Sequence, residues 1–211
     1  DPQLRIEIQP YRRFEYVGWS NVDIQVYQKS KHKLIQPHPL FGDKRVRRAL
    51  TMAIHRDELV QSWLGEYGQA SVGAVSPAFQ WAYNDTIHPL AYDLSSARQG
   101  LADAGWTDHD GDGILDKNGK KFEFTLMTNS ANPRREFAAQ KIQSDLKKIG
   151  IDCHVAFLEN NVFNSGLKNK EYEAFITGMT TAMTPDLEAQ FGSDLEKNLF
   201  NAQSYQSAAV D

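Results

Sequence analysis

The chain has 211 residues, and its 23 lysines and arginines against 27 aspartates and glutamates give a formal net charge of -4. This balance argues against the basic footprint of a nucleic-acid-binding protein, and it is too mild for an acidic disordered tail. Apolar residues make up 41% of the chain, which suits one globular domain or two small ones. No stretch approaches the ~18 apolar residues of a membrane span.

The first 30 residues are expected to form strands. Apolar residues alternate with polar ones in two places, which is the period of a half-buried strand. These places are Leu4, Ile6 and Ile8, and then Val22, Ile24 and Val26, with a turn or crossing expected at 10–13. The opening residues lack the basic region and apolar run of a signal peptide, so we expect a cytosolic chain or a mature or excised piece of a longer one.

Three helices are expected next, around a long loop. Asp43 is a suitable N-cap, and apolar residues at 46, 49, 50, 53 and 54 then lie on one helical face. A second apolar run follows and ends at Gly65, and a third, short helix is expected between a cap at Asp93 and Gly105.

The stretch between the second and third helices, residues 65–92, is expected to be irregular, and we name it the aromatic loop. It carries Phe79, Trp81 and Tyr83 among glycines and prolines. A loop of this length inside a compact domain is usually functional or packed on itself.

An acidic loop at residues 108–116 is the best candidate for a metal site. Carboxylates at alternate positions can point at one centre, as a hard cation such as calcium requires. The candidate ligands are Asp108, Asp110, Asp112, the carbonyl of Ile114 and the side chain of Asp116. Gly119 stands where a calcium loop has its bidentate glutamate, so two interpretations stay open: a structural calcium site, and an Asx-turn that needs no metal.

The second half of the chain predicts a strand–helix–strand unit. Apolar alternation at 122–126 predicts one strand, and alternation at 151, 153, 155 and 157 predicts another over 152–158. A helix is expected between them over 135–149, which implies a parallel strand pair with a crossover helix. A further short strand is expected at 174–177, followed by a loop of small residues and methionines at 178–185.

The sequence carries no enzyme signature. It has no G-x-S-x-G, no P-loop, no H-E-x-x-H and no C-x-x-C, and its six histidines are scattered, with none at metal-ligand spacing from another. We therefore expect a protein that is not an enzyme and that requires no cofactor. The alternative, a hydrolase or transferase domain, would need a nucleophile with a base in reach.

Several segments together resemble one family. Residues 41–50, FGDKRVRRAL, with AIHR at 53–56, are similar to the F-x-D-x-R-V-R-x-A-L…A-I-D-R signature of family 5 extracellular solute-binding proteins, the receptors of peptide and nickel ABC importers. Further similar blocks follow in order at 92–106, 110–113, 132–151, 185–193 and 201–211. The resemblance runs from about residue 15 to the end, and this order of blocks is much more specific than any single one.

The resemblance implies an α/β fold: one lobe of a type II (cluster C) periplasmic binding protein, with a mixed sheet and flanking helices. Residues 1–211 would be a single C-terminal-lobe fragment, with hinge-proximal strands at 1–30, the lobe body at 31–211 and the N-terminal lobe absent. It would capture peptides or a similar oligomeric solute outside the inner membrane and deliver them to an ABC permease. The protein would be periplasmic, or an extracellular lipoprotein on the outer face of the cytoplasmic membrane.

The resemblance also implies which segments line the ligand cleft: the aromatic loop, the strand–helix loop at 129–134 and the loop that follows the last strand. The candidate residues are Trp81, Tyr83, Asn129, Asn132, Arg134, Gly178, Met179, Thr180, Thr181 and Met183. Arg134 or Asn132 could meet a ligand carboxylate. The peptide receptors of the family grip the ligand's amino group with an aspartate, but no acidic residue lies between Gly178 and Asp186. An oligosaccharide, a metal chelate or another small molecule therefore stays open as the ligand, as does a calcium-dependent interaction module.

Overall fold

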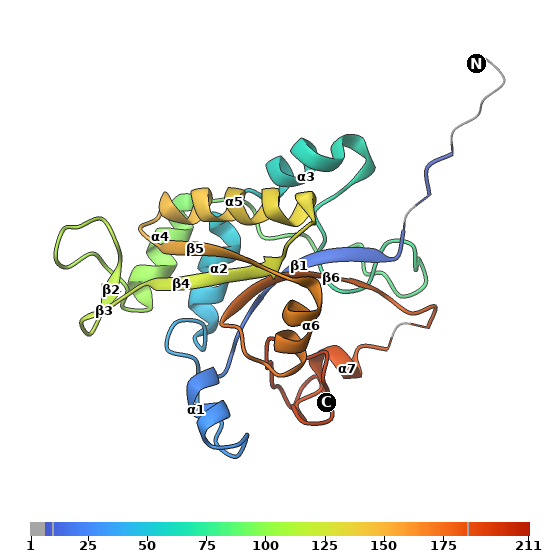
Figure 1. Cartoon of the computed structure of the whole chain (residues 1–211). Coiled ribbons are helices and arrows are strands. Elements are labelled where there is room, and N and C mark those ends of the chain that lie inside the picture. The colour runs from blue at the N-terminus through green and yellow to red at the C-terminus, as the bar shows by residue number, and fades with distance from the viewer. Residues whose placement is uncertain (1–6, 10, 185) are drawn as a thin grey trace.

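A four-stranded mixed sheet forms the centre of the molecule, in a computed structural model that describes residues 7–9, 11–184 and 186–211 (Figure 1). The strands are β1 (Arg13–Trp19), β4 (Glu123–Asn129), β5 (Asp152–Leu158) and β6 (Ala174–Thr180), in the order β1-β6-β4-β5. β4 is parallel to both β5 and β6, whereas β1 is antiparallel to β6. The predicted α/β class with a mixed sheet and flanking helices is confirmed.

The two crossover helices, α5 (Pro133–Lys147) and α6 (Asn160–Lys168), lie on opposite faces of this sheet (Figure 1). On one face, Ile142 of α5 packs in the main core with Leu126 of β4. On the other face, Phe163 of α6 packs against Phe175 of β6 in a second, smaller cluster. The alternation of strand side chains thus gives the sheet two buried faces, as is usual for α/β proteins.

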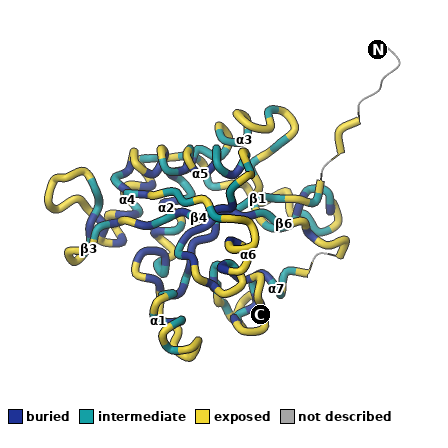
Figure 2. Tube along the Cα trace, in the orientation of Figure 1, coloured by how far each residue is buried: buried dark blue, intermediate teal, exposed yellow. Residues whose placement is uncertain are grey.

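Three further helices flank the main core: α2 (Lys44–Ala53), α3 (Arg56–Leu64) and α4 (Leu94–Asp103), with a short 3-10 helix, η1 (Gly65–Tyr67), after α3. Both predicted caps form, because Asp43 accepts a hydrogen bond from the Arg45 amide at 2.8 Å and Asp93 accepts one from the Ser96 amide at 3.0 Å. Figure 2 shows the buried residues gathered in the sheet and on the inward faces of α2, α4 and α5. No helix in the described part of the chain is both long and apolar enough to cross a membrane.

The N-terminal strands differ from the prediction. Residues 22–26 do not form a strand: the segment Ile24–Lys29 is a helix, α1, because Asp23 caps it by accepting hydrogen bonds from the next turn. Val22 makes only an isolated bridge to Pro37. Ile8 is 58% exposed and outside any strand, while Leu4, Ile6 and Pro10 lie outside the described residues. The one strand that the described part of this region forms is β1.

Smaller differences concern the later part of the chain. β6 continues to Thr180, so the predicted loop at 178–185 is wrong for its first three residues, which pair with β1 from Arg13 to Glu15. The helices α6 and α7 (Glu188–Phe191) and the hairpin of β2 (Asp116–Lys117) and β3 (Lys120–Lys121) were not predicted. The crossover unit itself is confirmed, and β5 has the bounds expected from its apolar alternation.

Candidate functional site

The carboxyl ends of the three parallel strands meet at one side of the sheet, which we name the carboxyl edge. β4 ends there at Asn129, β5 at Leu158 and β6 at Thr180, which lies opposite Arg13 at the start of β1. In open α/β sheets ligands bind in the crevice outside these strand ends, where the crossover connections leave in opposite directions. The connections from β4 and β5 pass to opposite faces here, so the carboxyl edge is the candidate site.

A cluster of arginines surrounds one carboxylate at this edge. Glu15 of β1 accepts hydrogen bonds from Arg134 at 2.6 Å and from Arg135 at 2.8 Å, both in the first turn of α5, and it also pairs with Arg13 at 3.0 Å. Arg135 is 7% exposed and reaches on to the Asn129 side-chain oxygen at 2.6 Å. Burial would raise the pKa of Glu15, but the hydrogen bond and charge of Arg135, helped by the other two arginines, hold it below its usual value.

The cluster changes how three predicted cleft residues are understood. Arg134 is committed to Glu15, although its Nε atom is buried without a hydrogen-bond partner. Asn132 caps α5 by accepting a hydrogen bond from the Arg135 amide at 3.3 Å. Gly178 sits opposite Glu15, and a Cβ atom at this glycine would overlap the carboxylate. Glu15 is the residue that sequence reasoning missed, because it reaches the site through a strand pairing far along the chain.

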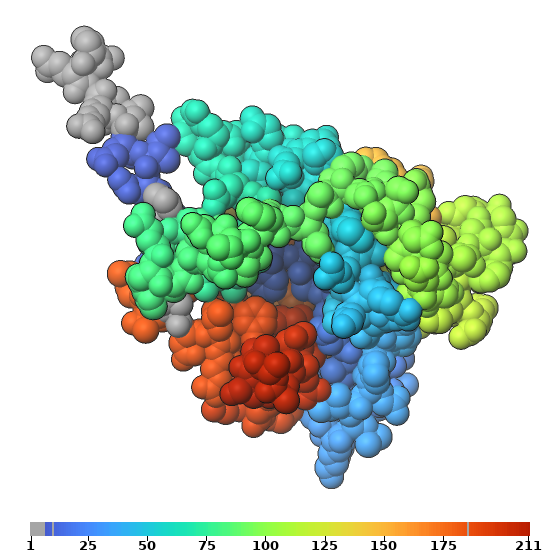
Figure 3. All heavy atoms as spheres, turned by 180° about the vertical axis from the view of Figure 1, so that it is seen from behind, coloured from blue at the N-terminus to red at the C-terminus, as the bar shows by residue number. Residues whose placement is uncertain are grey.

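The aromatic loop is fastened to the same edge. The Ser76 hydroxyl donates to the Tyr11 carbonyl at 2.8 Å, and the Thr181 hydroxyl donates to the Ala74 carbonyl at 3.3 Å. Figure 3 shows the loop crossing the back of the molecule from α3 toward the segment that follows β6. Phe79 anchors the loop with only 5% exposure. The structure therefore brings all three predicted segments to the carboxyl edge.

The predicted residues differ in how far they face solvent. Trp81 and Met183 are each 73% exposed, and Thr180 is also exposed. Tyr83 and Met179 are half-buried, whereas Thr181 and Asn129 are buried. Trp81 and Met183 thus leave large apolar side chains bare on two of the segments that meet at the carboxyl edge.

The acidic loop brings part of the predicted metal set together, away from the carboxyl edge. Carboxylate oxygens of Asp108, Asp110 and Asp112 lie within 4.8 Å of one another. Asp116 is directed elsewhere and pairs with His109 at 2.9 Å. Asp108 and Asp112 accept backbone hydrogen bonds within the loop, including one from the Ile114 amide at 2.9 Å, as in an Asx-turn. The Lys121 ammonium contacts Asp110 and Asp112, so calcium binding stays a prediction.

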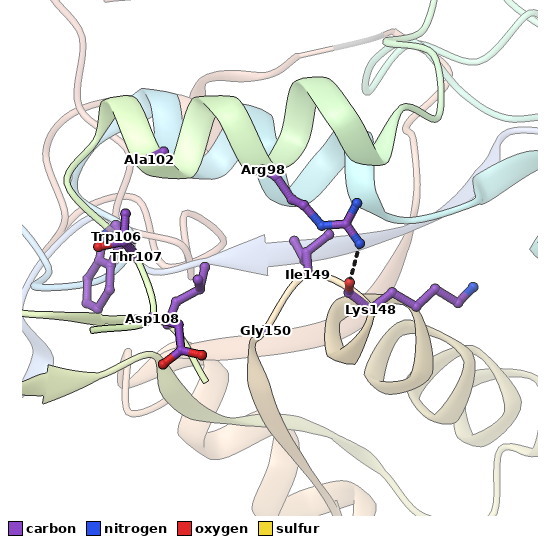
Figure 4. A pocket seen from close by; sticks show the side chains of 9 residues that line it. Arg98, Ala102, Trp106, Thr107, Asp108, Lys148, Ile149 and Gly150 are labelled. Carbon is purple, nitrogen blue, oxygen red and sulfur yellow. Dashed lines mark hydrogen bonds between the residues drawn. The ribbon is translucent and has the colours of Figure 1, made fainter. Parts of the chain in front are cut away.

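Two surface hollows lie elsewhere on the described part of the chain. One, of 330 Å³, lies between α4 and the C-terminal end of α5, where Arg98 donates to the Lys148 carbonyl at 2.6 Å (Figure 4). The other, of 490 Å³, lies between α7 and the C-terminal residues. Neither is lined by residues of the carboxyl edge, and in the first the Arg98 guanidinium is already bonded to the Lys148 carbonyl. We therefore keep the carboxyl edge as the candidate site.

Comparisons with known proteins agree on one family. Residues 4–198 match the sequence model described as bacterial extracellular solute-binding proteins, family 5 Middle. The oligopeptide-binding protein AppA of Bacillus subtilis is 35% identical over 202 residues, which cover 94% of this chain and 34% of AppA. The structure of that AppA in complex with a nonapeptide superposes with a TM-score of 0.84 at 34% identity, covering 96% of this chain and 38% of AppA.

A more distant structure shares the fold. NikZ of Campylobacter jejuni, in complex with Ni(L-His), superposes with a TM-score of 0.77 at 22% identity, over 97% of this chain and 39% of NikZ. The probable ABC transporter-binding protein of Deinococcus radiodurans is 33% identical over 67% of this chain and 25% of its own length. The chain therefore spans about a quarter to a third of the length of these curated relatives.

Proposed function

Because the chain belongs to the family 5 bacterial extracellular solute-binding proteins, we propose that it forms part of the receptor of an ABC importer. In this proposal residues 1–211 are one lobe, with the body at 31–211, and the opposing lobe lies elsewhere in a longer protein. The receptor works outside the inner membrane, either in the periplasm or attached to the outer face of the cytoplasmic membrane. It hands its solute to the permease of the importer.

The carboxyl edge is the observation that carries the proposal. The segments that meet there carry two exposed apolar side chains, Trp81 on the aromatic loop and Met183 after β6, and no second element covers these side chains in the described residues. The same edge holds the arginines around Glu15. This arrangement suits one wall of a cleft that closes over a ligand. Closure would bury the apolar groups and strengthen the polar contacts, and the permease would then recognise the closed state.

The receptor binds its solute without changing it. The groups that meet at the carboxyl edge are guanidiniums, amides, hydroxyls and apolar side chains, together with a carboxylate already held by three arginines. None of these is a nucleophile with a base in hydrogen-bond reach, which acyl or phosphoryl transfer would need. The edge can orient a solute, and the energy of binding drives the change of conformation.

A peptide is the solute that we favour. The relative most like this chain among those described above is named as an oligopeptide-binding protein, and its structure holds a nonapeptide. Trp81 and Met183 offer an aromatic face and a flexible thioether, which adapt to many side chains. Backbone groups of the β6 end would bind the peptide main chain, which is the same for every sequence.

Calorimetry on the full-length receptor that carries this chain tests the proposal. Peptides of two to nine residues are expected to bind, and oligosaccharides are not. Trp81→Ala is expected to weaken peptide binding at least tenfold. Leu34→Ala is the matched control, since Leu34 is also an exposed apolar residue, 56% exposed, but lies after α1 at the other end of β1. If oligosaccharides bind and peptides do not, the solute is not a peptide. If Trp81→Ala and Leu34→Ala weaken peptide binding equally, the carboxyl edge is not the binding site.

A further inference from the structure

A second group of metal-ligating side chains lies on the sheet, outside the carboxyl edge. Glu123 is the first residue of β4, and Asp152 and His154 belong to the neighbouring strand β5. The parallel register places Glu123 directly opposite Asp152. Residues two apart on a strand share a face, so Asp152 and His154 point to the same side. Cys153 between them is 3% exposed and packs in the main core on the opposite face.

Both carboxylates approach the same nitrogen of His154. The Nε2 atom of His154 lies 3.1 Å from a carboxylate oxygen of Glu123 and 3.5 Å from one of Asp152. All three ligand atoms lie within 4.8 Å of one another. A zinc ion with nitrogen and oxygen ligands at about 2.0–2.1 Å in a tetrahedron requires ligand atoms about 3.3 Å apart. The two separations from His154 fall on either side of that value, and the two carboxylate oxygens lie within 4.8 Å of each other, so rotation of the exposed side chains can seat the ion.

The charges favour a cation at this point. Like charges directly opposite each other on neighbouring strands destabilise the pairing, and Glu123 and Asp152 are such a pair. A protonated His154 could balance one of these two negative charges, but a divalent ion balances both. One imidazole nitrogen with two carboxylates also selects among metals, because imidazole suits zinc and its neighbours whereas calcium takes oxygen ligands only.

We propose that Glu123, Asp152 and His154 bind a divalent transition-metal ion of the zinc type on the open face of the β4–β5 pair. The three groups are about half exposed, between 46% and 58%, so the ion would keep a water-accessible fourth position. The site is at the start of β4, at the opposite end of the strand from Asn129. It is therefore separate from the solute cleft and does not depend on the proposed function.

Titration of the 211-residue chain with zinc chloride, followed by calorimetry, tests this site. One zinc ion per chain is expected, with a dissociation constant in the micromolar range. His154→Asn and Glu123→Gln are each expected to weaken zinc binding at least tenfold, and circular dichroism confirms that both variants fold. Both positions are exposed, so the substitutions leave the core intact.

His109→Asn is the matched control, because His109 is the exposed histidine beside the acidic loop and its aspartates. It is expected to bind zinc as the unchanged chain does. Retention of zinc binding in His154→Asn, or its loss in His109→Asn, would overturn the proposal, as would a chain that binds no zinc at millimolar concentration. When calcium chloride replaces zinc chloride, the unchanged chain and His154→Asn are expected to give the same heat of binding.

Discussion

The Glu15 carboxylate on β1 accepts a hydrogen bond from Nε of Arg135 on α5 at 2.8 Å. These residues lie 120 positions apart in the chain, and the bond joins the edge strand of the sheet to the N-terminal turn of its crossover helix. The contact fixes the arginines at the carboxyl edge, where the solute cleft is proposed. Its removal should therefore affect both stability and the shape of the candidate site.

Glu15→Gln is expected to lower the free energy of unfolding by about 2 kcal/mol, because it leaves two half-buried or buried guanidiniums without their anion. Urea denaturation followed by tryptophan fluorescence measures the change. Glu188→Gln is the control, since its ion pair with Lys197 is mostly exposed and should contribute little to the free energy of unfolding. Equal effects of the two substitutions would show that the arginine cluster does not support the fold.

Acid stability is expected to depend on Asp145, a fully buried carboxylate on α5. It accepts hydrogen bonds from Lys141 at 2.7 Å, Lys148 at 2.7 Å and the His55 amide at 3.1 Å. Burial raises the pKa of Asp145, but these bonds outweigh burial and hold it below the ordinary value of 3.8. The stabilisation is thus complete above the pKa of the unfolded chain and is lost as the pH falls through the lower folded value.

Asp145→Asn is therefore expected to lower stability by about 3 kcal/mol at neutral pH and to flatten the fall in stability below about pH 4. Urea midpoints at a series of pH values measure both effects. Asp85→Asn, which changes an exposed carboxylate in the aromatic loop, is the control and should leave the curve unchanged. If the stability of Asp145→Asn falls with decreasing pH as steeply as that of the unchanged chain, Asp145 is not the source of the acid dependence.

Local signals allowed much of the fold to be predicted from the sequence. Asp43 and Asp93 cap their helices through side chains that reach amides two or three residues ahead, so the signal lies within one turn. The same holds for β5, where Cys153 and Val155 alternate with polar residues and face the main core. Residues 22–26 alternate in the same way, but the cap at Asp23 and the burial of Tyr27 favour a helix over Ile24–Lys29 instead.

The candidate site was predictable only in part. The resemblance to the family implied the three segments that lie at the carboxyl edge, and each follows a strand end or forms a long loop. Glu15 was not predictable, because nothing near it in sequence shows that β1 pairs with β6. Asp152 and His154 carried a weak signal in their spacing of two on an expected strand, but their third partner, Glu123, belongs to another strand.

Gly18→Ala is expected to destabilise the chain by about 2 kcal/mol, because a Cβ atom at this position would overlap the buried ring of Phe175 on the facing strand. The ring is enclosed by the second cluster and has no room to move aside. Gly73→Ala is the matched control, since nothing lies within 4 Å of the added atom. The difference between the two urea midpoints measures the packing of β1 on β6, and equal midpoints would contradict it.

Calcium binding in the acidic loop is expected to depend on Lys121. Its ammonium contacts Asp112 and Asp110, and these carboxylates raise the pKa of Lys121, so it stays charged and occupies the place of a cation. A calcium ion at Asp108, Asp110 and Asp112 must displace it. Lys121→Gln removes this competitor and is expected to bind calcium at least fivefold more tightly.

Terbium luminescence, with calcium as the competitor, measures this change. Lys120→Gln is the matched control, because it removes the same charge from the adjacent position of the hairpin, and the contacts with Asp110 and Asp112 come from Lys121. If only the loss of one positive charge mattered, both variants would bind calcium more tightly by the same factor. If calcium must displace the Lys121 ammonium, only Lys121→Gln binds calcium more tightly. If neither variant binds calcium at ~1 mM, the affinity of the weaker extracellular calcium modules, the loop is an Asx-turn held together by Lys121 and needs no metal.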